Sequence, residues 1–259
     1  MKNPILEDTA QVYLRRREYL IFHLVSLAGA VLMTFALWPS RGFMYFFRTE
    51  SVPAVFQATV IVHVLAVTGL SLYAGLDRLA DAQIIRYSEW LERTALPVGV
   101  LARGKILAGF VHTLMLTVVF LPFAVIAAGP AGIPIAAVLA SEVIVLLSGI
   151  AGRLAGMLIS HAGETRYVIR VIGGWIFVAV LFVATIQFYQ PLNPIYAVIA
   201  QHAEDSPLMR TDTATSLVEH PLFSSGVPLA VTIAALVALY WYSLARHRRI
   251  AEREREQHA

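Results

Sequence analysis

Six apolar segments, each long enough to cross a membrane, constrain this chain more than any other feature. They cover residues 19–38, 52–76, 106–128, 133–159, 171–189 and 227–244. A helix needs about 20 mainly apolar residues to cross the hydrocarbon core of a bilayer. We therefore predict an all-α, polytopic membrane protein in which residues 19–244 form a domain of six transmembrane helices.

The composition agrees with this class and excludes several functions. Apolar residues make up 58% of the chain and the mean hydropathy is +0.69, whereas soluble domains average about 45–50% apolar residues. The chain has no cysteine, which excludes disulfides, thiolate chemistry and Cys-ligated metals. The net charge of +3 does not indicate a nucleic-acid partner, because the basic residues flank the apolar segments.

The distribution of Lys and Arg predicts the orientation in the membrane. If the N-terminus is inside, only Arg41, Arg48 and Arg210 of the 20 basic residues fall in outer segments, and the other seventeen are assigned to inner ones. Cytoplasmic loops carry such an excess of positive charge. We expect both termini in the cytoplasm of a prokaryotic cell, with residues 1–18 forming an interfacial segment and residues 245–259 a charged tail that is helical or disordered.

A polar interval at residues 77–105 separates the second and third apolar segments. It contains nine charged residues, while Ala80, Ile84, Tyr87 and Leu91 recur at helical spacing, which predicts an amphipathic helix. We expect Pro97 and Gly99 to end this helix before the third span. The interval is interpreted as a docking surface for a partner protein, and the alternative is a solvated loop helix. The docking candidates are Arg86, Glu89, Trp90, Glu92, Arg93, Thr94 and Pro97.

One motif in this interval imitates a phosphate-binding loop. Residues 99–105 fit G-x-x-x-x-G-K, but Ile106 stands where Ser or Thr would bind Mg²⁺, and no apolar strand precedes the motif. Lys105 is better explained as a lysine whose amine reaches the membrane interface. The sequence therefore predicts no nucleotide site and no catalytic residue, and any ATP and Mg²⁺ would be bound by a partner chain.

Polar residues inside the apolar segments are candidate functional groups. Glu142 lies in the fourth segment and His63 near the middle of the second, so the two can share a depth in the membrane. An intramembrane carboxylate is costly and often functional. Two interpretations stay open: a polar point in a translocation path, or a buried pair that holds helices together.

Small residues in the fourth segment indicate close helix packing. Gly149, Gly152 and Gly156 are spaced so that a neighbouring helix can approach closely. We expect a packing role for them, within or between subunits.

Two short runs resemble a known family. Glu89–Thr94 is followed by Leu96-Pro97-Val98 and then Gly104-Lys105, and Asn193-Pro194-Ile195-Tyr196 follows the fifth segment. With six spans and cytoplasmic termini, these runs resemble an ABC-2 type transporter permease. The resemblance implies a transmembrane subunit of an exporter that pairs with a second permease subunit, as a homodimer or heterodimer.

The same resemblance implies further partners and elements. A separate ATP-binding-cassette subunit would dock on the coupling helix between the second and third spans, with residues 160–170 as a smaller contact. Short re-entrant helices in residues 190–226 would close the path at the outer side. Membrane lipid is the remaining partner, and the substrate class stays open.

Two other classes compete with a permease. His23 and His112 both lie toward the cytoplasmic side, and as axial haem ligands they would make the protein a membrane electron carrier. An intramembrane protease is disfavoured, because the sequence has neither a Gly-x-Ser-Gly run nor paired aspartates in the spans.

Overall fold

The computed structural model describes residues 20–32 except 22, 26 and 30, and residues 53–76, 97–129, 132–162, 167–185, 190–200 and 221–258. Within these ranges the chain is helical and contains no strand. The α-helices are α4 (Pro53–Gly75), α6 (Val98–Ala128), α7 (Ile135–Ala162), α8 (Tyr167–Ala179), α10 (Pro194–Ala200) and α12 (Pro221–His258). The described positions among residues 20–32 are also helical.

Four of these helices are long and apolar enough to cross a membrane, namely α4, α6, α7 and α12. Residues 172–184 form a shorter apolar helix. The prediction of an all-helical membrane protein is therefore confirmed. The arrangement of six spans with cytoplasmic termini stays a prediction, because much of the first segment lies outside the described residues.

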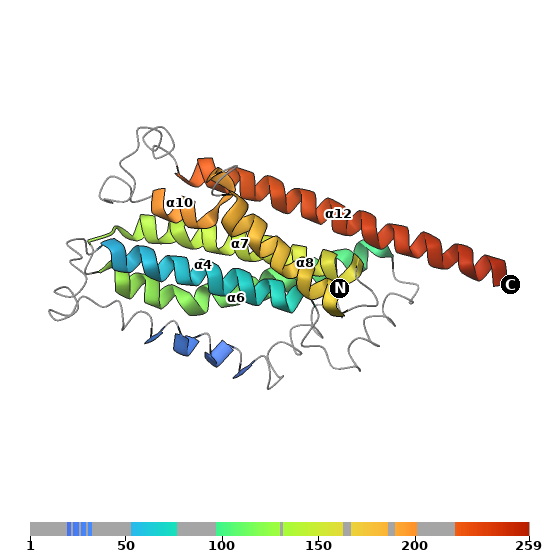
Figure 1. The fold of residues 1–259 in the computed structure, drawn as a ribbon, viewed down its shortest axis with the longest axis horizontal. Helices are drawn as coiled ribbons and strands as arrows, with labels where there is room; N and C mark the ends of the chain where they lie inside the picture. The colour runs from blue at the N-terminus through green and yellow to red at the C-terminus, as the bar shows by residue number, and fades with distance from the viewer. Residues whose placement is uncertain are drawn as a thin grey trace.

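Helix α4 lies at the centre of the bundle and α12 at its edge. Figure 1 shows α4, α6 and α7 side by side, with α12 running along α7. Buried residues make up 67% of the apolar window of α4 but only 17% of that of α12. The sequence of α4 is apolar around its whole circumference, which is typical of a helix enclosed by others.

The closest packing in the bundle joins α4 to α7 through glycines. A Cβ atom on Gly152 would lie 2.8 Å from the backbone oxygen of Thr68, and one on Gly149 would lie 2.8 Å from Cγ1 of Val67. Gly156 faces the backbone of Leu72 and Gly75 at still closer range. The expected packing role of these three glycines is confirmed within the chain, because side chains there would force the helices apart.

Helix α6 begins earlier than the sequence predicted. We expected Pro97 and Gly99 to keep residues 97–105 out of the third span, but α6 starts at Val98 and continues without a break through Gly99 and Lys105. Pro97 precedes the first turn with φ −56° and ψ 137°, and its carbonyl accepts the N–H groups of Val100 and Leu101. Gly99 stays helical beside the ring of Trp241. Because these residues form a helix, the G-x-x-x-x-G-K run does not form a phosphate-binding loop.

The fifth apolar segment is interrupted. Helix α8 is followed by a π-helical turn at Val180–Ala184. The next described residues form a 3-10 turn at Gln190–Leu192, and α10 follows. Helix α10 packs against α4, α7 and α12. The apolar run after the fifth segment thus forms a short helix, Pro194–Ala200.

Helix α12 is one continuous helix of 38 residues. At 1.5 Å per residue it is about 57 Å long, nearly twice the roughly 30 Å of a hydrocarbon core. It therefore includes the charged tail that was expected to be either helical or disordered. Figure 1 shows its C-terminal part projecting beyond the bundle.

Candidate functional site

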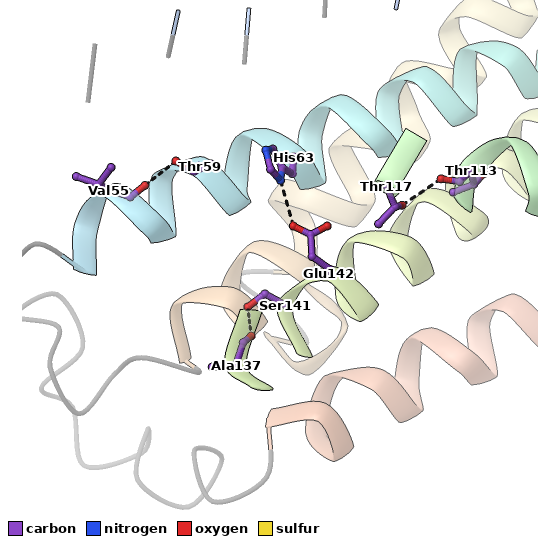
Figure 2. Close-up of polar contacts among 8 residues, drawn as sticks. All are labelled: Val55, Thr59, His63, Thr113, Thr117, Ala137, Ser141 and Glu142. Atoms are coloured by element: carbon purple, nitrogen blue, oxygen red, sulfur yellow. Dashed lines mark hydrogen bonds and ion pairs between the residues drawn. The ribbon is translucent and has the colours of Figure 1, made fainter. Parts of the chain in front are cut away.

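The strongest candidate for function in the described helices is the pair formed by His63 and Glu142. Glu142 is the single carboxylate in the four apolar spans Val55–Gly75, Val98–Ala128, Ile135–Ser160 and Ser225–Arg246. Helix α4 supplies His63 and α7 supplies Glu142, and the glycine packing between these helices brings the two side chains together (Figure 2). The two side chains are in contact, and their place in a translocation path stays a prediction.

The pair is buried and directly hydrogen-bonded. His63 Nδ1 lies 3.2 Å from Glu142 Oε1, and the side chains are 0% and 6% exposed. The ring of Phe120 on α6 packs against the His63 ring, with 5.3 Å between the ring centroids. An ionised acid at the centre of a membrane helix costs about 3 kcal/mol on insertion scales. The hydrogen bond between Glu142 and His63 reduces that cost, whichever of the two carries the proton.

Each member of the pair keeps one polar atom without a hydrogen-bond partner among the described residues. These atoms are His63 Nε2 and Glu142 Oε2. Buried polar atoms are nearly always bonded, and exceptions are often linked to function or to a bound water or ion. The arrangement is therefore able to hold a further small polar species or to exchange a proton.

A second polar contact joins α4 to α6. It lies about two turns beyond His63 along α4, toward the end of the bundle from which α12 projects. Thr113 donates its hydroxyl proton to the Gly109 carbonyl (3.0 Å), so Ser71 is the donor in the 3.1 Å contact between the Ser71 and Thr113 hydroxyls. Thr117 in turn donates to the Thr113 carbonyl at 3.0 Å. These hydroxyls satisfy each other and the helix backbone, which favours a role in packing.

Arg153 is a buried charge that the sequence prediction misplaced. It was assigned to an inner loop in the charge count, but it lies within α7 and is 5% exposed. Its side chain packs over Gly109, where a Cβ atom would lie 2.9 Å from Arg153 Cγ. Arg153 and His23 are both neighbours of His112. The signal that was missed is positional: residue 153 falls inside the apolar segment 133–159.

His23 and His112 do not fit a haem site as they are arranged. Their ring centroids are 5.5 Å apart and the rings meet edge to face at 79°. Two axial imidazoles bind haem iron from opposite faces of the macrocycle, so the porphyrin must lie between them. Direct contact between the two rings leaves no place for it.

Comparison with known proteins gives no match: no family model, curated protein or solved structure is similar to this chain.

The predicted docking residues are mostly outside the described part of the chain. Arg86, Glu89, Trp90, Glu92, Arg93 and Thr94 all lie there. Pro97 is described and exposed at the start of α6. The structure therefore brings together His63 and Glu142, while the docking surface stays a prediction. Among the described residues, no group of three or more His, Asp and Glu side chains is arranged to hold a metal ion.

Proposed function

We propose that this protein is the transmembrane permease subunit of an ATP-binding-cassette exporter. It pairs with a second permease subunit in the cytoplasmic membrane, and a separate ATPase subunit hydrolyses ATP. The proposal combines the resemblance of the Glu89–Lys105 and Asn193–Tyr196 runs with the all-helical membrane architecture.

The observation that carries the proposal is the position of the two residues that flank the charged interval, Leu76 and Val98. Leu76, at the end of α4, packs with Ala155 and Ile159 of α7. Val98, at the start of α6, packs with Met157 and Leu158 of the same stretch of α7. Residues 77–96 therefore connect two points at one end of the bundle, as a coupling segment on a single membrane face requires.

The charged extension of α12 leaves from the same end. Tyr240 and Leu244 of α12 pack with Met157 and Ala102, and the helix then continues to His258 (Figure 1). The charged extension of α12 and both ends of the charged interval thus lie at the same end of the bundle. A charged surface there would favour association with a soluble partner, because charged groups set partner choice and association rate.

At the opposite end, α10 supports the second element of the proposal. Its cap residue Asn193 is fully buried, and the helix packs against α4, α7 and α12. A short helix that returns into the bundle after an interrupted fifth helix is suited to closing a path. Non-helical backbone at such a depth is tolerated only where protein or water covers it.

Reversing two charges in the docking segment tests the proposal. We expect Glu89→Arg/Glu92→Arg to insert and purify normally, since surface charges change stability by only about 0.5 kcal/mol. The variant should lose co-purification with the ATP-binding-cassette subunit encoded beside it and lose coupled ATP hydrolysis in lipid. Glu204→Arg/Asp205→Arg, in the segment 190–226 that is predicted to lie on the opposite side of the membrane, is the matched control. A Glu89/Glu92 variant with normal binding and turnover would remove this segment as the docking site.

A further inference from the structure

We propose that Glu142 carries one exchangeable proton, held against a neutral His63. The ligand is a proton, and its binding site is the buried contact between His63 on α4 and Glu142 on α7. The inference concerns the membrane helices alone, so it stands or falls independently of the ATPase partner.

Charge balance in a buried site is the first argument. With the proton bound, the Glu142 carboxyl and the His63 imidazole are both neutral, and the O–H on Oε1 donates to Nδ1 across the observed 3.2 Å. When the proton leaves, a full negative charge remains at a site where the side chains are 0% and 6% exposed. A membrane interior strongly disfavours that state.

The unpartnered atoms support the same assignment. Glu142 Oε2 has no hydrogen-bond partner among the described residues. A carboxylate oxygen needs partners far more than the carbonyl oxygen of a neutral carboxyl does. The unpartnered Oε2 therefore supports a neutral carboxyl, and release of the proton requires water or a cation to reach this oxygen.

No described cation is positioned to replace the proton. Arg153 follows Glu142 on α7 by about 16 Å at 1.5 Å per residue, and His112, beside His23, is about 12 Å along α6 from Phe120. Arg103 and Lys105 lie farther along α6. The other ionisable groups with described side chains on the packed helices are tyrosines and terminal arginines: Tyr73, Tyr196, Tyr240, Tyr242, Arg246 and Arg249. Release of the proton must therefore be linked to a rearrangement around the pair.

Infrared difference spectroscopy of the full chain in lipid bilayers tests this inference. Between acid and alkaline pH we expect the carbonyl band of one protonated carboxyl to disappear, and to shift in D₂O. Glu142→Gln should abolish this band, and the matched control Glu256→Gln on the extension of α12 should keep it. His63→Gln should keep the band but move its midpoint, because the contact at Nδ1 is changed.

The experiment also distinguishes the alternatives. If Glu142→Gln does not fold, Glu142→Asp decides, since it should keep a titrating carboxyl band at a shifted frequency. A wild-type spectrum without a Glu142-dependent carboxyl band would overturn the inference. So would a band that Na⁺ or K⁺ removes at constant pH, because the site would then bind a metal cation in place of the proton.

Discussion

Asn193 shows how a single residue can join two elements at the end of the bundle. Its Nδ2 donates to the Phe182 carbonyl (3.1 Å) and to Thr185 Oγ1 (2.9 Å), where the fifth helix ends. Its Oδ1 accepts the N–H groups of Ile195 and Tyr196, at 2.9 and 3.1 Å, which caps α10. The residue is fully buried, so each of these bonds is made away from water.

Replacing Asn193 by Ala should therefore destabilise the protein by about 2 kcal/mol, because it removes a helix cap and leaves buried groups unpaired. Asn193→Ser should lie between Ala and wild type, since Ser still caps α10 but does not reach Phe182 and Thr185. Thermal unfolding of the purified variants in lipid measures both effects. Equal stability of all three proteins would show that the cap does not hold α10 in place.

At the scale of helices, the packing of α4 on α7 decides where the His63–Glu142 pair lies. Gly149, Gly152 and Gly156 leave the C-terminal half of one face of α7 free of bulky side chains, so that the backbone of α4 can approach. In a membrane, close packing of small residues replaces the hydrophobic effect as the main driving force for helix association. The distance between the two members of the pair follows from this approach.

Gly152→Ala should destabilise the protein by about 1–3 kcal/mol, the usual cost of overpacking, since its Cβ would lie 2.8 Å from the Thr68 carbonyl oxygen. Gly69→Ala on α4 is a matched control, because nothing lies within 4 Å of its Cβ position. That control should be neutral or slightly stabilising, since Ala favours a helix by about 1 kcal/mol over Gly. Unfolding measurements that rank the two variants in the opposite order would contradict the packing described.

For the whole molecule, the two ends of the bundle differ in chemistry. One end carries the boundaries of the charged interval and the long extension of α12, and the other carries α10 and the turn between α6 and α7. In that turn Gly132 adopts φ 64°, a conformation that favours glycine, and donates to the Gly129 carbonyl at 3.1 Å. With Arg153 inside α7, sixteen of the 20 basic residues still fall in segments predicted to be inner and three in segments predicted to be outer.

Reporter fusions along the chain test this polarity. We expect fusions after Pro130 and Thr211 to report an outer location, and fusions after Glu92, Glu164 and Ala259 an inner one, because the basic residues gather on the inner segments. A reproducible inversion of any one of these five reporters would disprove the arrangement of six spans.

The sequence by itself determined the class of the protein and identified candidate functional residues. Apolar segments of membrane length require helices, because a backbone in lipid must satisfy its own hydrogen bonds, and this logic located α4, α6, α7 and α12. Glu142 was identified as a candidate because carboxylates are rare in such segments. Only the tertiary structure decided that His63 is its partner, that Arg153 is buried over Gly109, and that His23 and His112 touch each other. Those facts depend on how neighbouring helices are rotated and how closely they approach. Contacts between residues far apart in the sequence determine both.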